Sequence, residues 1–152
     1  MISYLKEGTK FNFSKRRICT KWIKSVIQDE CHNVTNEEAA YRKSTGDISV
    51  VFCSDEYLLE INKKFLSHDY FTDVITFDYS SPKYISGDIF ISIHTVRANS
   101  LLYKQDFSTE LYRVIIHGIL HLLGYKDKTK TQRQTMRLKE DFYLNKIELN
   151  DR

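Results

Sequence analysis

The sequence predicts a single α/β domain over residues 1–152, with a mixed sheet of about four strands packed against about five helices. The chain has 152 residues, the usual size of one domain. Apolar residues make up 41%, and there are only one proline and five glycines, which is typical of packed regular structure. In addition, β-branched runs alternate with segments of helical periodicity, the pattern of an α/β fold.

The N-terminal part of the chain is predicted to contain a short strand, a helix and a loop. Residues 11–13 have the composition of a strand. Ser14 can cap a following helix, because the apolar residues after it recur at helical spacing. Residues 31–46 are polar and lack periodicity, which indicates a loop.

The middle of the chain is predicted to hold three strands and one helix. The β-branched run at 47–53 is typical of a buried strand, and Ser54 can cap a helix that runs to about Phe65. Two further strands, at 74–79 and 87–93, are separated by a short turn. Such a short connection favours antiparallel pairing of these two strands.

Three helices are predicted in the last third of the chain. The first covers 95–104, and the last is an amphipathic helix over 131–147. Between them lies a long apolar helix with Ser108 as its predicted cap and Gly124 as its end. Because of its apolar character, we expect this helix to be central in the fold.

Charge and composition exclude some classes of protein. The net charge is +3 and the pI about 8.7, too mild to predict nucleic-acid binding by itself. No apolar run is long enough to predict a transmembrane helix, and the N-terminus lacks the apolar core of a secretory signal. The three cysteines form no CxxC pair and are typical of free thiols. We therefore expect a cytoplasmic protein without a membrane partner.

The segment "VIIHGILHLLGYKDK" carries a predicted metal site at the end of the central helix. His117 and His121 are four residues apart, so they share one face of the helix. Gly124 can end the helix and let the chain turn back, which brings Asp127 towards the same point. Two imidazoles and a carboxylate are ligands suited to one divalent ion, with Zn²⁺ the best match.

Two other interpretations of this segment are open. The histidines can be a structural pair on a buried helix, without any metal. The spacing also resembles that of metzincin proteases, which carry a glutamate as general base directly after the first histidine. Here that position is Gly118, which argues against a peptidase.

The stretch "HGILHLLGYKD" resembles the signature H-G-x-L-H-L-x-G-Y-D-H of the YbeY family of bacterial ribosomal-RNA maturation endoribonucleases. Residues 58–79 and 86–92 resemble two further segments of that family, and the likeness covers roughly residues 45–145. The resemblance implies a metal-dependent endoribonuclease specific for single strands. It would mature the 3′ end of 16S ribosomal RNA, serve ribosome quality control, and have the small ribosomal subunit or its proteins as partners.

The chain departs from the family pattern at two positions. Asp127 stands where the family has a third histidine ligand, and aspartate is also an accepted zinc ligand. Leu66 stands where the family has an arginine thought to serve catalysis, and leucine cannot pair with phosphate. The loss of this arginine favours an alternative function, a non-catalytic or weakly catalytic ribosome-assembly factor that binds ribosomal RNA and protein.

Candidate RNA-binding residues lie around the predicted ligands. Lys126 and Lys128 flank Asp127 and can neutralise a phosphate, although a solvated loop would have the same composition. Three aromatic residues can stack on bases: Tyr70, Phe71 and Tyr125. Two more residues match the family segment and can line a cleft or form a turn: Thr72 and Asp73. No catalytic residue is assigned.

Overall fold

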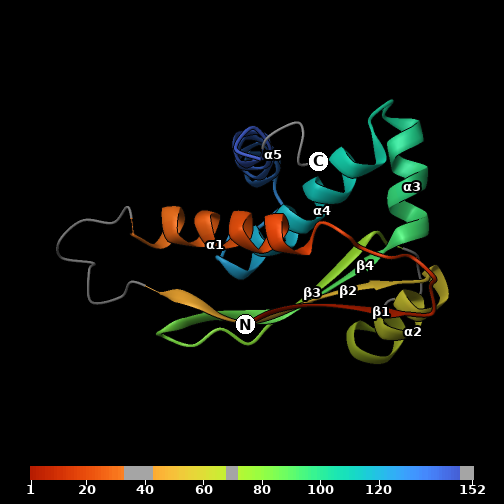
Figure 1. Cartoon of the computed structure of the whole chain (residues 1–152), viewed down its shortest axis with the longest axis horizontal. Coiled ribbons are helices and arrows are strands. Elements are labelled where there is room, and N and C mark those ends of the chain that lie inside the picture. Colours follow the sequence, from red (N-terminus) through yellow and green to blue (C-terminus); the bar gives the residue numbers. More distant parts are fainter. Residues whose placement is uncertain (33–42, 68–71, 148–152) are drawn as a thin grey trace.

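A computed structural model describes residues 1–32, 43–67 and 72–147 (Figure 1). Within these ranges there are four strands and five helices, the numbers that the sequence predicts. The elements follow the chain in the order β1 (Ile2–Glu7), α1 (Arg16–His32), β2 (Ser44–Cys53), α2 (Asp55–Leu66), β3 (Val74–Asp78), β4 (Tyr84–Ser92), α3 (Ile93–Leu102), α4 (Phe107–Leu122) and α5 (Lys130–Leu144).

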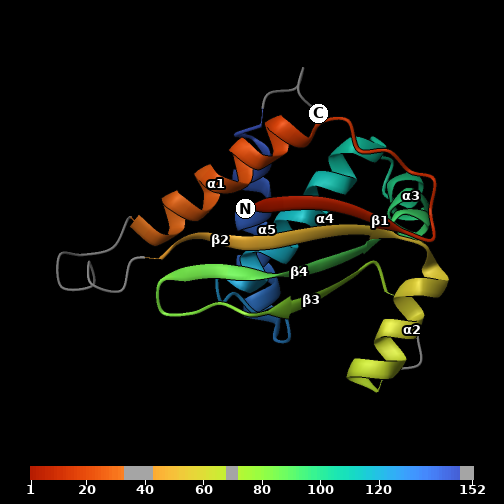
Figure 2. The same ribbon diagram turned by 60° about the horizontal axis from the view of Figure 1, so that its bottom comes forward.

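The four strands form one mixed sheet in the order β1-β2-β4-β3 (Figure 2). Strands β1, β2 and β4 are parallel, with α1 as the crossover from β1 to β2, and α2 and β3 between β2 and β4. Strand β3 is antiparallel to β4, with Val74 opposite Ile91 and Asp78 opposite Gly87. The predicted mixed sheet and the predicted hairpin are therefore confirmed.

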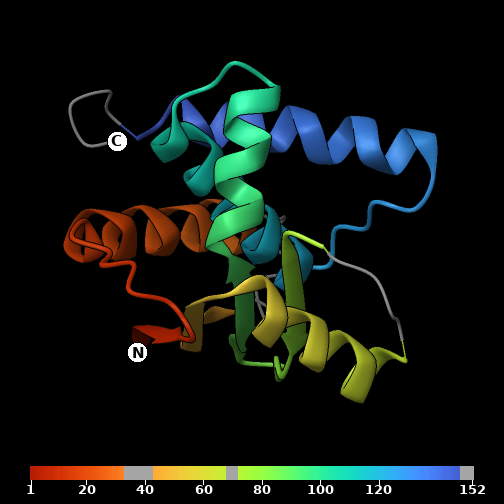
Figure 3. The ribbon, with the colours of Figure 1, turned by 90° about the vertical axis from the view of Figure 1, so that its right-hand side faces the viewer.

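Helices cover both faces of the sheet, but unequally. Figure 3 shows α2 on one side of the sheet and α1, α4 and α5 on the other. The large core lies on the side of α4, where Ile89 and Ile91 are fully buried. The intervening residue Phe90 faces the smaller cluster under α2, as the alternation of side chains along a strand dictates.

Helix α4 is the central helix of the fold, because most of its residues are buried. Gly118 lies so close to the sheet that an added Cβ would come within 2.7 Å of Ile89 Cγ2. At the end of the helix Gly124 has a φ of +101°, a conformation that glycine adopts without strain. The amide of Tyr125 then donates to the carbonyl of Leu120 at 3.0 Å and closes the last turn. The predicted end at Gly124 is confirmed.

Two predictions about the N-terminal part and the central helix are wrong. Residues 11–13 are not a strand. The chain has apolar residues at positions 11 and 13 because the rings of Phe11 and Phe13 pack against Phe52, at centroid distances of 5.2 and 5.0 Å. The first strand is β1 instead. The cap of α4 is Asp106 rather than Ser108, which lies inside the helix.

Other boundaries agree with the prediction or shift slightly. Ser54 caps α2 by accepting the amide of Tyr57, as expected. The predicted loop at 31–46 loses its ends to α1 and β2, and all of its remainder except Lys43 lies outside the described residues.

The cysteines and the membrane prediction can also be compared with the structure. Cys19, Cys31 and Cys53 are free thiols, as predicted. Across the described ranges, every helix is too short or too polar to cross a membrane.

Candidate metal centre

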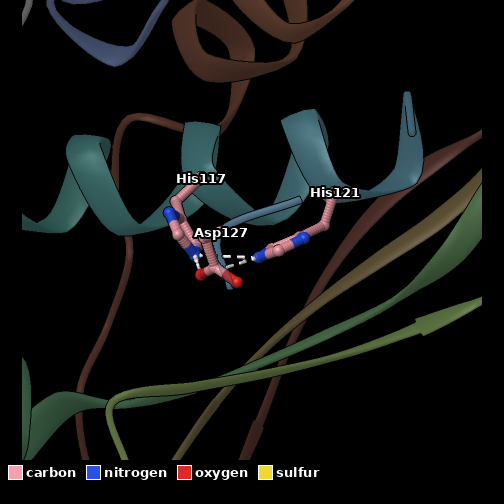
Figure 4. Close-up of side chains that lie close together, drawn as sticks. All are labelled: His117, His121 and Asp127. Carbon is pink, nitrogen blue, oxygen red and sulfur yellow. Dashed lines mark hydrogen bonds and ion pairs between the residues drawn. The ribbon is translucent and has the colours of Figure 1, made fainter. Parts of the chain in front are cut away.

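Three side chains converge at the C-terminal end of α4. His117 and His121 lie one helical turn apart, and Asp127 reaches them from the loop that leads to α5 (Figure 4). The two Nε2 atoms are 3.0 Å apart, and Asp127 Oδ2 is 3.3 Å from each of them. Among the described residues, this is the one group of three histidine, cysteine or acidic side chains close enough to hold a metal ion.

These distances fit a divalent ion. In a tetrahedral zinc site with bonds of about 2.0–2.1 Å, the ligand atoms lie about 3.3 Å apart. The observed separations of 3.0–3.3 Å are therefore close to those of three ligands around one ion. A catalytic zinc site has three protein ligands and keeps the fourth position for water or substrate.

The hydrogen bonds of the other ring nitrogens support the same conclusion. His117 Nδ1 donates to Glu140 Oε2 at 2.7 Å, and His121 Nδ1 donates to the carbonyl of Tyr125 at 2.9 Å. Both partners are acceptors only, so each Nδ1 carries the proton and each Nε2 presents a lone pair. Two lone pairs and a carboxylate oxygen thus face one point, where a cation is needed to balance them.

The raised pKa of His117 also indicates a site that favours positive charge. Burial lowers the pKa of His117, but the hydrogen bond and charge of Glu140, together with the charges of Asp127 and Asp73, outweigh it, so the pKa is raised overall. The surroundings of His117 therefore favour positive charge at its ring, whether a proton or a metal ion supplies it.

Glu140 on α5 is a supporting residue that sequence reasoning missed. Its side chain is 7% exposed, and its second oxygen accepts from Arg113 Nη1 at 3.0 Å. Arg113 in turn donates to Asp141 at 2.7 Å. A signal was present in the sequence, because Glu140 lies on the buried stripe of α5 between Met136 and Leu144. A charged residue on such a stripe indicates a buried partner.

Two cavities meet at His117 and Asp127. The larger, of about 540 Å³, is bounded opposite α4 by α2 and β3, with Leu66, Asp73 and Thr76 in its wall. The smaller, of about 330 Å³, also contains Asp73, His117 and Asp127, together with Glu110, Arg113, Arg137 and Glu140. Burial raises the pKa of two acids in the walls of these cavities, Asp73 and Glu110. Because both cavities reach His117 and Asp127, the candidate metal centre is open to a ligand from two sides.

The structure brings only some of the predicted RNA-binding residues to these cavities. Lys128, Thr72 and Asp73 line the larger cavity, whereas Lys126 is exposed and is not part of its lining. Leu66 also lines it, 40% exposed, so the position that lacks the family's arginine faces the candidate centre. The following predicted positions lie outside the described residues: Tyr70 and Phe71.

Tyr125 has a different place from the one predicted for a base-stacking residue. Its ring lines another cavity, of about 360 Å³, next to Glu30 and Gly124. Its hydroxyl donates to Glu30.

The fold and the site define an α/β protein with a candidate metal centre of two histidines and one aspartate at the end of its central helix. A family model described as endoribonuclease YbeY matches residues 9–148. The chain belongs to this family.

Similar proteins are found among characterised sequences and solved structures. The endoribonuclease YbeY of Phocaeicola vulgatus is 46% identical over 149 residues, covering 98% of this chain and all of that protein. The endoribonuclease YbeY of Parabacteroides distasonis is 45% identical over 140 residues, covering 92% of this chain and 91% of that protein. The solution structure of TM1509 from Thermotoga maritima has a TM-score of 0.64 at 24% identity, covering 97% of this chain and 89% of that one. This last likeness concerns the fold alone.

Proposed function

We propose that the chain is a metal-dependent endoribonuclease, specific for single strands, that processes ribosomal RNA. Its expected tasks are maturation of the 3′ end of 16S ribosomal RNA and ribosome quality control. One observation carries the proposal: in a member of the endoribonuclease YbeY family, three ligand-type atoms lie 3.0–3.3 Å apart beside an open cavity.

The metal ligands in this proposal are His117 and His121, through Nε2, and the carboxylate of Asp127. We propose one ion per chain, with Zn²⁺ as its identity, because two imidazoles and a carboxylate form a typical zinc donor set. A bound ion of this kind supplies Lewis-acid chemistry, since it acidifies water and offsets the charge that develops on a phosphate. The role of the protein is to hold the three donors in one orientation and to admit the RNA.

The protein itself supplies charge and shape around the phosphate. Lys128 lines the larger cavity with the proposed ligands, and we propose that its ammonium group binds an RNA phosphate there. Lys126 is exposed next to it and can contact a phosphate further along the strand. Gly118 faces Ile89 in the sheet, so the position that carries the general base in metzincins points away from the cavity.

A second function is favoured by Leu66. Its apolar side chain occupies the cavity wall where the family pattern has an arginine, and it provides no charge for a phosphate. The alternative is a ribosome-assembly factor that binds ribosomal RNA and a ribosomal protein but cuts RNA poorly. In that case the metal would mainly stabilise the end of α4.

RNA cleavage by matched variants distinguishes the two functions. A defined single-stranded RNA is incubated with wild-type protein and with His121→Ala, both purified without a nickel column, and the metal content of each is measured by mass spectrometry. The endoribonuclease proposal expects about one zinc per wild-type chain, with metal and cleavage both lost in His121→Ala. Equal cleavage by the two proteins would indicate a contaminating nuclease and refute the enzymatic function. Bound metal without cleavage would favour the assembly factor.

Location and partners follow from the proposed substrate. Because ribosomal RNA is matured in the bacterial cytoplasm, we propose that the protein acts there. We propose the small ribosomal subunit or one of its proteins as the partner. Residues 1–152 would act as one metal-dependent hydrolase domain.

A further inference from the structure

Tyr125 links the orientation of one proposed ligand to the path of the chain that carries another. Its carbonyl accepts the hydrogen bond from His121 Nδ1 at 2.9 Å, and its amide closes the last turn of α4 on Leu120. Asp127 follows two residues later. A displacement of Tyr125 would therefore rotate the imidazole of His121 and shift the carboxylate of Asp127 at the same time.

The side chain of Tyr125 is held by residues far away in the sequence. Its hydroxyl donates to Oε1 of Glu30, near the end of α1 and 95 positions earlier in the chain. The ammonium group of Lys139, on α5, lies 5.7 Å from the centre of the Tyr125 ring. Tyr125 is thus fixed between two helices that contribute no metal ligand themselves.

Glu30 is the centre of this arrangement. Its side chain is 12% exposed, and its second oxygen accepts from Lys139 Nζ at 3.0 Å and from the hydroxyl of Tyr143. Burial raises the pKa of Glu30, but the hydrogen bonds from Tyr125, Tyr143 and Lys139, together with the positive charge of Lys139, outweigh it and lower the pKa overall. The group is therefore a charged carboxylate at neutral pH, fixed by three donors.

We propose that Glu30 is a positioning residue for the metal centre, which acts through Tyr125 on the orientation of His121 and on the loop that carries Asp127. This inference rests on the proposed metal site. Outer-sphere partners of metal ligands commonly change the affinity for the metal by about 10–100-fold. Glu30 contacts Tyr125 and not a proposed ligand itself, so we expect its loss to weaken metal affinity by about tenfold, at the lower end of that range.

Co²⁺ binding tests this role, because its visible absorption reports the geometry of the ligands as well as the affinity. The proteins compared are wild type, Glu30→Leu, which has no acceptor for the hydroxyl of Tyr125, Tyr125→Phe and the double variant. Asp29→Asn is the matched control. Asp29 neighbours Glu30 on α1 and shares the hydroxyl of Tyr143 with it, 2.7 Å from Asp29, whereas the hydroxyl of Tyr125 donates to Glu30. Thermal unfolding of each protein in the presence of a chelator measures stability separately from metal binding.

The proposal expects the same loss from either end of the Tyr125–Glu30 hydrogen bond. Glu30→Leu and Tyr125→Phe should each raise the Kd for Co²⁺ about tenfold and change its absorption spectrum. The double variant should be no weaker than the weaker single variant, because both substitutions remove the Tyr125–Glu30 hydrogen bond. Asp29→Asn should bind Co²⁺ within about twofold of wild type even where its unfolding temperature falls, because this substitution leaves the Tyr125–Glu30 hydrogen bond in place.

Three results would overturn this inference while leaving the proposed metal site intact. The first is a Kd for Glu30→Leu within about twofold of wild type, and the second is an equal loss in Asp29→Asn. The third is a double variant weaker by about the product of the two single effects, as for independent sites. Wild-type protein that binds no Co²⁺ would instead refute the proposed metal site and this inference together.

Discussion

Replacing Glu140 with glutamine should weaken both the fold and the metal centre. Glu140 accepts from His117 Nδ1 at 2.7 Å and from Arg113 Nη1 at 3.0 Å, one donor on each oxygen. Glutamine has one carbonyl oxygen and an amide group in place of the second oxygen. The carbonyl oxygen of glutamine can accept from one of the two donors, His117 or Arg113. Its amide group then faces the other donor and cannot accept from it.

The size of the effect follows from the burial of the pair. A hydrogen bond to a charged group contributes about 1.5–3 kcal/mol, and a buried donor left without an acceptor costs a similar amount. Because Arg113 keeps its bond to the half-exposed Asp141, we expect the free energy of unfolding to fall by about 2 kcal/mol. Since His117 loses its fixed orientation or its proton acceptor, the affinity for zinc should fall by about 10–100-fold.

Two measurements on the same protein check this prediction. Urea unfolding in the presence of a chelator gives the stability of the metal-free protein. Competition with a chromophoric chelator gives the affinity for zinc. Asp141→Asn is the control, because Asp141 also accepts from Arg113, at 2.7 Å, but is 50% exposed. It should lose less stability than Glu140→Gln and keep its affinity for zinc.

One result would refute this reasoning. If Glu140→Gln binds zinc as tightly as wild type, Glu140 does not orient His117. The contact in the structure would then serve only the packing of α4 against α5.

Three further predictions follow from the site and its surroundings. Gly118→Ala should lower the free energy of unfolding by about 1–3 kcal/mol, because its Cβ would come within 2.7 Å of the buried Ile89; an unchanged urea midpoint would contradict the close packing. The raised pKa of His117 means that its pair with Glu140 stabilises the metal-free protein fully below the unfolded pKa of 6.5 and is lost as pH rises through the folded value. Zinc affinity should change the other way, falling as pH drops through that folded value, because the proton competes for the imidazole; urea unfolding and zinc titration at about pH 6 and 8 measure both trends. Asp127→Ala should bind zinc more weakly, whereas Asp127→His should retain or strengthen binding; metal content unchanged in the alanine variant would show that Asp127 is not a ligand.

Elements with strong local signals could be predicted from the sequence. The apolar repeat and Gly124 define α4, and the short turn between β3 and β4 defines their pairing. Strand β1 was missed because it lies at the edge of the sheet and buries fully only Tyr4, so it lacks a clear alternation. Conversely, the alternation of Phe11 and Phe13 with a polar residue has the pattern of a strand, but these two rings are apolar core residues of a loop that packs against Phe52.

In the candidate site, too, contacts between residues close in the sequence could be predicted, whereas contacts between distant residues could not. His117, His121 and Asp127 are brought together by one helical turn and one glycine, so their spacing was sufficient to predict the cluster. The residues that orient them could not be found in this way. Glu140 lies 23 positions from His117, and Glu30 lies 95 positions from Tyr125, so both contacts exist only once α1, α4 and α5 have packed.

In the proposed metal site, this separation of ligands from their supports would tie metal binding to folding. An unfolded chain still contains His117, His121 and Asp127, but Glu140 and Tyr125 no longer hold the two imidazoles in place. A metal ion at this site would therefore bind the native chain in preference to the unfolded one, and each tenfold excess of free metal over the Kd would add about 1.4 kcal/mol to the stability of the native state. Depletion of the metal lowers this margin and exposes the chain to proteases more often. The lifetime of the protein, and not only its activity, would then follow the supply of metal.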